Sequence, residues 1–392
     1  KLSLVIILSE CSSLGLISIK SVLIILPYSA PVLLELDTVQ YLILSYLALS
    51  FVSRLRTCVL PTWLILGLLF LLYSLHRCLT EKIWRRKLIT VIFVNLYLVV
   101  FTSYWPVTVL ILTWLAYDWK TPERGGRRVT SVRNWRLWKH YCDYFPLRLL
   151  KTHDISPSYN YILVCHPHGV LSHSWFGQFA TNGLCFSKIF PGITPYVLTL
   201  GAFFWVPLLR DYVMSSGTCS VSQSSMDFLL THRGTGNMLI VVVGGLAECK
   251  YSLPGSTTLV LKNRTGFVRM ALRHGVPLIP AYAFGEADLY SQHIFTPGGL
   301  VNRFQKWFQS MVHIYPCAFY GRGFTENSWG LLPYAQPVTT IVGKPLPLPK
   351  IENPSQETVA KYHALYTDAL RKLFDQHKTK FGISETQELV IV

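Results

Sequence analysis

The chain has 392 residues, of which 51% are hydrophobic. Its mean hydropathy of +0.35 is high for a soluble protein, so the composition indicates that the protein associates with a membrane. The formal net charge of +16 comes from basic residues that cluster beside apolar runs, as at the cytoplasmic face of a bilayer, so we do not expect nucleic acid as a partner. The nine cysteines include no CxxC and no zinc-type spacing, which excludes a disulfide framework and favours reduced, mostly buried thiols.

Residues 1–87 form a hydrophobic extension without a regular pattern. Its longest apolar run, Val59 to Leu75, is about long enough for a marginal membrane span. The run Lys1 to Leu8 resembles a signal peptide, but no clear cleavage site with small residues follows it. The sequence therefore does not fix the topology or processing of this extension.

Residues 88–117 are nearly uncharged and are interrupted at Pro106. Both flanks are basic, and the segment 118–151 alone holds nine Lys or Arg against three acids. Positive flanks stay on the cytosolic side, so we expect a membrane hairpin broken near Pro106, with a single kinked span as the alternative. Tryptophans interleave with the charges of 118–151, which is typical of a basic linker at the bilayer interface.

The segment 152–392 is predicted to be a cytosol-facing α/β domain, because short β-rich runs alternate with helical segments and Gly and Pro separate them. The β-rich runs are 161–165, 239–243, 278–284, 312–319 and 338–342, and the helical segments are 168–181, 222–233, 264–274 and 356–378. The apolar stretch 196–209 is too short to span a bilayer, which leaves a core helix or a membrane-dipping wall that admits a lipid chain.

Two histidines end the first predicted strand, in His166-Pro167-His168-Gly169. Pro167 suits the first position of a helix, and a helix start would keep His168 neutral and available as a general base. Amides near Gly169 could bind an oxyanion, because glycine permits the close approach of a carbonyl. The sequence does not exclude that His166 and His168 exchange roles.

A carboxylate, Glu248, follows the predicted strand 239–243, at the end where parallel sheets place their sites. Glu248 could hold one tautomer of the imidazole, as the acid of a catalytic triad does. The alternative is that Glu248 is an ordinary glutamate in a surface loop. Glu286 and Asp288 follow another predicted strand, and we expect structural or hydrogen-bonding roles for them.

Four cations lie at and before the predicted helix 264–274, and they are Lys262, Arg264, Arg269 and Arg273. Arg269 and Arg273 share one helix face, so the group could grip phosphates, with a solvated charged surface as the alternative.

Six motifs together resemble the diacylglycerol acyltransferase 2 family, over about residues 91–392. They are His166-Pro-His-Gly169, Gly244-Gly-Leu-Ala-Glu248, Arg264-Thr-Gly-Phe-Val-Arg-Met-Ala271, His274-Gly-Val-Pro-Leu-Ile-Pro280, Gly285-Glu-Ala-Asp-Leu-Tyr290 and Tyr320-Gly-Arg-Gly-Phe324. The resemblance implies a glycerolipid-acyltransferase-like mixed sheet flanked by helices and anchored by an N-terminal transmembrane or re-entrant hairpin, in the endoplasmic reticulum membrane. Glycerolipid acyltransferases carry Asp five residues after the catalytic His, but Leu171 and His173 stand at those places here, so Glu248 is the candidate acid.

The resemblance also implies the reaction, in which a long-chain alcohol, retinol or an acylglycerol attacks a fatty acyl-CoA. Acyl-CoA is then a co-substrate, no cofactor or metal is needed, and membrane lipid is a further partner. His168 would take the hydroxyl proton with support from Glu248, while an acyl-enzyme on Cys165 is the minor alternative. Two other classes stay open: a metal-dependent hydrolase that uses His166, His168 and His173, and a non-catalytic protein that coats lipid droplets.

Overall fold

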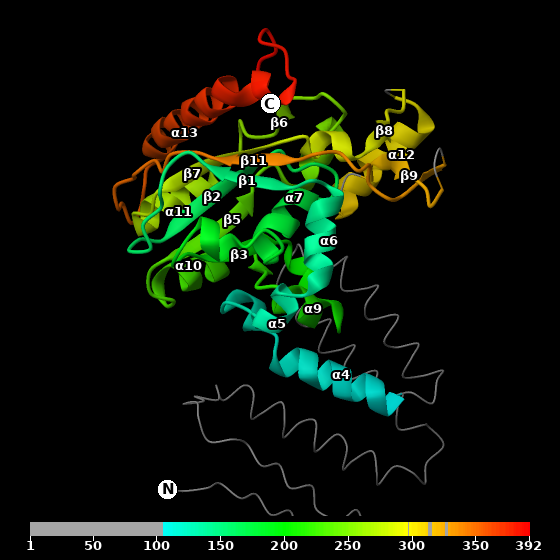
Figure 1. The fold of residues 1–392 in the computed structure, drawn as a ribbon. Coiled ribbons are helices and arrows are strands. Elements are labelled where there is room, and N and C mark those ends of the chain that lie inside the picture. The colour runs from blue at the N-terminus through cyan, green and yellow to red at the C-terminus, as the bar shows by residue number, and fades with distance from the viewer. Residues whose placement is uncertain (1–104, 297, 313–315, 326–327) are drawn as a thin grey trace, which may run out of the picture. The chain divides into compact units, whose positions relative to one another are not determined.

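A mixed seven-stranded sheet forms the centre of the computed structural model, which describes residues 105–296, 298–312, 316–325 and 328–392 (Figure 1). The strand order is β1-β11-β7-β2-β5-β3-β4. The strands are β1 (Arg148–Lys151), β2 (Tyr161–His166), β3 (Thr194–Thr199), β4 (Cys219–Ser220), β5 (Asn237–Val242), β7 (Leu278–Phe284) and β11 (Thr339–Val342). Strands β7, β2, β5, β3 and β4 are parallel, whereas β11 runs antiparallel to β7. The carboxyl ends of β7, β2 and β5 therefore lie side by side.

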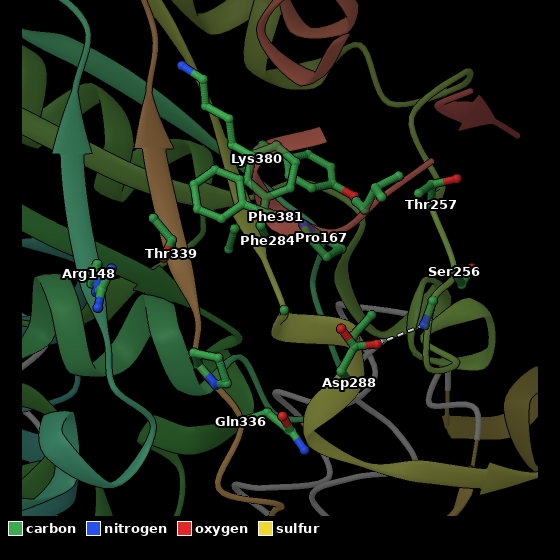
Figure 2. Close-up of a pocket in the computed structure, with 17 residues that line it drawn as sticks. Arg148, Pro167, Ser256, Thr257, Phe284, Asp288, Gln336, Thr339, Lys380 and Phe381 are labelled. Atoms are coloured by element: carbon green, nitrogen blue, oxygen red, sulfur yellow. Dashed lines mark hydrogen bonds between the residues drawn. The ribbon is translucent and has the colours of Figure 1, made fainter. Parts of the chain in front are cut away.

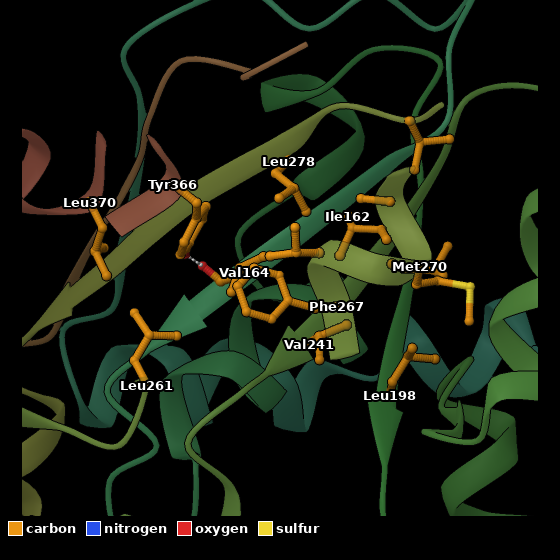
Figure 3. Packing of buried hydrophobic residues seen from close by; sticks show 14 of the residues in the cluster. Ile162, Val164, Leu198, Val241, Leu261, Phe267, Met270, Leu278, Tyr366 and Leu370 are labelled. Carbon is orange, nitrogen blue, oxygen red and sulfur yellow. Dashed lines mark hydrogen bonds between the residues drawn. The ribbon is translucent and has the colours of Figure 1, made fainter. Parts of the chain in front are cut away.

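Both faces of β2 are buried, and its alternating side chains enter two different cores. Ile162 and Val164 pack into one cluster, while Leu163 and Cys165 pack into the other. Because side chains alternate along a strand, His166 belongs to the same face as Ile162 and Val164. Figure 3 shows Ile162 and Val164 beside side chains of neighbouring strands and helices.

Three helices cover the Ile162 face: α10 (Gln223–Thr231), α11 (Gly266–His274) and α13 (Gln356–His377). Ser222 and Ser355 cap α10 and α13 by accepting from the amides of Ser225 and Thr358, at 3.2 and 3.1 Å, which satisfies donors that a helix start leaves unpaired. Gly275, with φ of 64°, ends α11 in the left-handed conformation.

The opposite face is covered by α6 (Arg136–Tyr144), by α8 (Phe186–Ile189), and by α7 (His173–Trp175), which continues into the π-helical turn η3 (Phe176–Ala180). Between α8 and α10 lie η4 (Gly201–Phe204) and α9 (Leu209–Ser215). Two smaller sheets complete the domain. One holds β8 (Ser291–His293), β9 (Ala318–Arg322) and β10 (Trp329–Gly330), with α12 (Leu300–Val312) between β8 and β9; the other pairs β6 (Thr258–Leu259) with β12 (Val390–Ile391).

The α/β class and most predicted elements are confirmed. Strand β7 spans 278–284 as predicted, β2, β5 and β11 differ by a few residues, and α10, α11 and α13 match their predicted segments.

Three predicted segments need correction. The predicted strand 312–319 is wrong, because α12 extends to Val312 and β9 begins at Ala318. The stretch 196–209 is no helix, since most of β3 occupies 196–199 and η4 follows. The predicted helix 168–181 begins only at His173, because Ser172 has φ of 57°.

The expected linker 118–151 also needs correction, since its second half belongs to the domain. Trp138, Cys142 and Phe145 are buried, and β1 forms an edge of the main sheet by pairing with β11. The domain therefore begins before residue 152.

Helix α4 (Trp105–Tyr117) is the first described element. Among the described residues, no helix combines the length and apolar character needed to cross a bilayer. The hydrophobic extension 1–87 and most of the expected hairpin 88–117 lie outside the described residues.

Candidate active site

The loops that follow β2, β5 and β7 bring the His166–Gly169 turn, Glu248 and Glu286 together at one edge of the sheet. This is where open parallel sheets place their sites, because the strand ends leave a crevice there. Glu248 lies just after the turn η5 (Gly245–Ala247), and Glu286 begins the turn η7 (Glu286–Leu289).

His166 points into the core rather than into the site. It is fully buried, and its Nε2 lies 3.0 Å from the hydroxyl of Tyr366 on α13. That hydroxyl donates weakly to the Val164 carbonyl, at 3.4 Å, so it accepts from Nε2 of His166. Burial lowers the pKa of His166 to about 3, which keeps the ring neutral.

His168 is half-buried, and its Nδ1 lies 3.0 Å from the carbonyl oxygen of Gly169. A carbonyl only accepts, so Nδ1 carries the proton and Nε2 keeps its lone pair. Burial lowers the pKa of His168, while the Gly169 carbonyl opposes the shift. The ring is therefore a neutral base at physiological pH. Its neutrality comes from burial and not from a helix start, since α7 begins five residues later.

Glu248 supports the turn in a way that the sequence did not predict. Its Oε1 accepts from the main-chain amide of His168 at 2.6 Å, and its Oε2 accepts from the amide of Val260 at 2.7 Å. The expected contact with the imidazole is therefore corrected to a contact with the backbone. Glu248 is fully buried, and burial raises its pKa to about 7 against the opposing effect of both amides and of Arg264.

Glu286 holds the other end of the same turn. Its two oxygens accept from the amides of His173 and Ser174, both at 2.9 Å, so this carboxylate occupies the start of α7. A Cβ on Gly169, where φ is +66°, would lie 2.7 Å from Oε1 of Glu286. Glycine is therefore required at position 169. Burial raises the pKa of Glu286 to about 7, although these amides oppose the shift.

Other contacts fix the turn between the two carboxylates. The His166–Pro167 bond is cis, and the Pro167 carbonyl accepts from Nε1 of Trp175 at 2.8 Å. The hydroxyl of Ser172 donates to the His168 carbonyl at 2.9 Å. The amides of Gly169 and Val170, in contrast, donate to no other described residue. The turn is thus held firmly while two of its amides stay available.

The imidazole of His173 forms buried hydrogen bonds of its own with two tyrosine hydroxyls. Its Nδ1 lies 2.7 Å from the Tyr141 hydroxyl and its Nε2 lies 3.0 Å from the Tyr290 hydroxyl. Burial lowers its pKa to about 4. The imidazoles of His166, His168 and His173 therefore have different partners, and no group of metal-ligating side chains converges within the described ranges.

The four candidate phosphate-binding cations are all exposed, and three of them have contacts that differ from one another. Arg264 acts on the carboxylate of Glu248. Arg269 donates to the side-chain oxygen of Gln356 at 3.0 Å, and Arg273 lies 3.8 Å from Asp227. Lys262 and Arg264 precede α11, so they are closer in sequence to the Glu248 partner Val260 than Arg269 and Arg273 are.

A cavity of about 550 Å³ adjoins the turn at Pro167 (Figure 2). Its wall includes the aromatic rings of Phe284 and Phe381, and its polar lining includes Arg148 and Lys380. Neither imidazole of the turn lines it, so the cavity lies beside the base and not around it.

A family model described as diacylglycerol acyltransferase matches residues 97–392. The chain belongs to this family. The acyl-CoA wax alcohol acyltransferase 2 of Homo sapiens is 84% identical over 303 residues, which cover 77% of this chain and 91% of that protein. The Mus musculus protein of the same name is 83% identical over 303 residues, which again cover 77% of this chain and 91% of that protein. The diacylglycerol O-acyltransferase 2 of Bos taurus is 49% identical over 291 residues, or 74% of this chain and 81% of that protein.

Among solved structures, the chain is similar to the 1-acyl-sn-glycerophosphate acyltransferase PlsC of Thermotoga maritima. The likeness covers 74% of this chain and 97% of that protein, with 10% identity and a TM-score of 0.32, so the fold assignment rests on the strand topology. The residues of the His166–Gly169 turn, Glu248 and Glu286 all lie within the part of the chain that the diacylglycerol acyltransferase family model matches.

Glu286 has the structural, hydrogen-bonding role that the sequence predicted, but its contact with the start of α7 was not predicted. The signal was present, because Glu286 follows β7 just as Glu248 follows β5, and both strands are neighbours of β2.

Proposed function

We propose that this acyltransferase moves a fatty acyl group from acyl-CoA to a long-chain alcohol or to retinol, which forms a wax ester or a retinyl ester. The wax alcohol acyltransferases named above, at 84% and 83% identity, support the alcohol acceptor. The observation that carries the mechanism is the 3.0 Å contact between Nδ1 of His168 and the Gly169 carbonyl, from which we infer that Nδ1 is protonated and that Nε2 keeps its lone pair.

In the proposed reaction, Nε2 of His168 takes the proton of the acceptor hydroxyl as its oxygen attacks the thioester carbon. The available amides of Gly169 and Val170 stabilise the oxyanion that forms. When the tetrahedral intermediate collapses, the carbon–sulfur bond breaks and the CoA thiolate takes the proton from the imidazolium. Glu248 and Glu286 act through the backbone by holding the turn, so they are positioning residues.

His166 is a poor candidate for the base. Its ring is fully buried and is bonded to Tyr366 on the core side of the sheet. Cys165 is equally unsuited to carry an acyl group, because it is fully buried and burial raises the pKa of its thiol. Direct attack of the acceptor on acyl-CoA therefore suits the site best.

The substrates would approach the turn from the surroundings already described. The aromatic wall of the cavity beside Pro167 suits an alkyl chain. Lys262 and Arg264 are exposed near the site and suit the phosphates of CoA. Arg269 and Arg273 would bind these phosphates only if they gave up their contacts with Gln356 and Asp227.

An acylglycerol is the second candidate acceptor, and the family match together with the bovine diacylglycerol O-acyltransferase 2 favours it. The deciding experiment offers a fatty alcohol, retinol, a monoacylglycerol and a diacylglycerol in turn to the purified full chain with one labelled acyl-CoA. We expect fatty alcohol and retinol to give the highest kcat/KM. A preference for diacylglycerol would overturn the wax or retinyl assignment, and no ester with any acceptor would favour a non-catalytic role. Activity that is lost with a chelator would instead support the metal-dependent hydrolase.

We also propose that the enzyme resides in the endoplasmic reticulum membrane with this domain facing the cytosol, because both flanks of 88–117 are basic. The sequon Asn263-Arg264-Thr265 provides a test, since Asn263 is exposed. In a cytosolic domain it stays unglycosylated, so endoglycosidase treatment should leave the mobility of the expressed chain unchanged. A shift that Asn263→Gln abolishes would place the domain in the lumen.

A further inference from the structure

Helix α12 turns its apolar side chains outward. Leu300 is 84% exposed, Phe304 54% and Trp307 55%. Their spacing of four and three residues places them in one stripe along the helix. The rings of Phe304 and Trp307 lie 5.6 Å apart, so they form one exposed aromatic surface.

The most buried of the described side chains of α12 is polar, which differs from the usual pattern of a surface helix. Gln305 is only 4% exposed, and its side-chain nitrogen donates to the Pro316 carbonyl at 2.8 Å. A helix that packs its apolar side onto a core would have the opposite arrangement. The outward stripe of α12 therefore belongs to neither hydrophobic core of the described residues.

The hairpin of β9 and β10, in the same small sheet, exposes large apolar side chains as well. Phe324 is 94% exposed, Trp329 83% and Leu331 71%. Single exposed apolar residues are ordinary on protein surfaces, but several large ones on neighbouring elements mark an interaction site. Figure 1 shows α12 with β8 and β9 at one end of the domain.

The charge of this part of the chain points to the kind of partner. From β8 to Leu331 the sequence contains three cations, Arg303, Lys306 and Arg322, but one acid, Glu326. Arg303 and Lys306 are both exposed on α12, and helical geometry places them along one side of the apolar stripe. Aromatic and aliphatic side chains flanked by cations suit lipid chains flanked by anionic headgroups.

We infer that the exposed stripe of α12 and the β9–β10 hairpin form a lipid-docking surface, which binds the interface of an anionic membrane. In sequence, this surface is separate from the active-site turn and from the hydrophobic segments before residue 118. It would give the domain a second membrane contact of its own.

Photo-crosslinking can map this contact on the intact chain. The full-length protein is reconstituted into phosphatidylcholine vesicles that contain a minor fraction of phosphatidylserine and a phospholipid with a diazirine on its acyl chain. After irradiation, peptide mapping locates the labels. We expect labels within 300–309 and 318–331, and none within 356–377 on α13.

Two variants separate lipid contact from misfolding. The double substitution Phe324→Ser with Trp329→Ser removes highly exposed side chains, so it should leave the fold intact while it lowers labelling of 318–331 by roughly tenfold. The matched control Leu365→Ser, at a side chain 44% exposed on α13, should leave labelling of 318–331 unchanged. Ester formation from water-soluble short-chain substrates should be the same in the wild type and in both variants. A loss of lipid labelling can therefore be distinguished from a failure of the proposed reaction.

Two results would overturn the inference. One is the absence of lipid labels from both 300–309 and 318–331 in vesicles that retain the protein. The other is crosslinking of these peptides to a second copy of the chain in place of lipid, which would make the surface a dimer interface.

Discussion

Replacing Glu286 with glutamine removes one of the two acceptors that hold the start of α7. Both oxygens of Glu286 accept from amides, those of His173 and Ser174, whereas a glutamine side chain has one accepting oxygen and a donating NH₂ group. Above pH 7, where Glu286 is ionised, one buried amide is therefore left without an acceptor, which costs about 2–3 kcal/mol for a bond to a charged group.

This loss should appear in the rate, because the turn carries the base. If the whole of this free energy serves to position His168, kcat falls by about 30- to 140-fold, since about 1.4 kcal/mol corresponds to a factor of ten. The KM for acyl-CoA should change little, because Glu286 is buried and does not touch the exposed cations. The assay measures ester formation from labelled acyl-CoA over a range of both substrates, together with thermal unfolding of the same preparations.

Asp227→Asn is the matched control. Asp227 also holds a polar partner, since its Oδ1 lies 2.7 Å from Nε2 of His274, but it lies on α10, away from the turn. We expect its kcat to be unchanged. A normal kcat in folded Glu286→Gln would refute the positioning role, and an equal loss in Asp227→Asn would show that the effect is general destabilisation.

Three further substitutions test other parts of the site. Gly169→Ala should lower kcat at least tenfold, because the left-handed backbone costs about 1–2 kcal/mol and the new Cβ would approach Glu286; unchanged kinetics would contradict a rigid turn. Tyr366→Phe should lower the unfolding free energy by about 1–3 kcal/mol, because it leaves Nε2 of His166 without its acceptor, and an unchanged Tm would argue against that bond. Glu248→Gln should change the pH dependence of stability. The Glu248 pKa is raised from 4.5 to about 7, so its stabilising contribution is complete below pH 4.5 and is lost as the pH rises to 7. The wild type should therefore lose about 3 kcal/mol relative to the variant over this range in denaturant titrations, and parallel profiles would contradict the shift.

The sequence predicted the elements that carry the site because their patterns are strong. The runs 161–165, 239–243 and 278–284 are continuous, apolar and bounded by turn residues, which is typical of buried parallel strands. The period of two along β2 would also have placed His166 in the core, since it follows Ile162 and Val164 on the same face.

The remaining errors have specific physical causes. A helix start at Pro167 was expected from local preference, but Glu286, more than a hundred residues away in sequence, caps α7 at His173. The contact of Glu248 with an amide depends on how its loop closes beside β2, which no local pattern encodes. The spacing of Leu300, Phe304 and Trp307 is that of an amphipathic helix, so α12 could have been predicted, whereas the outward direction of its apolar stripe depends on the tertiary structure.

The most direct test of the account measures ester formation by purified His168→Ala with labelled acyl-CoA and a fatty alcohol. We expect kcat to fall by about 10²- to 10⁴-fold, the typical contribution of a general base, while the variant keeps the Tm of the wild type. Turnover at the wild-type rate in folded His168→Ala would contradict the assignment of this imidazole as the base.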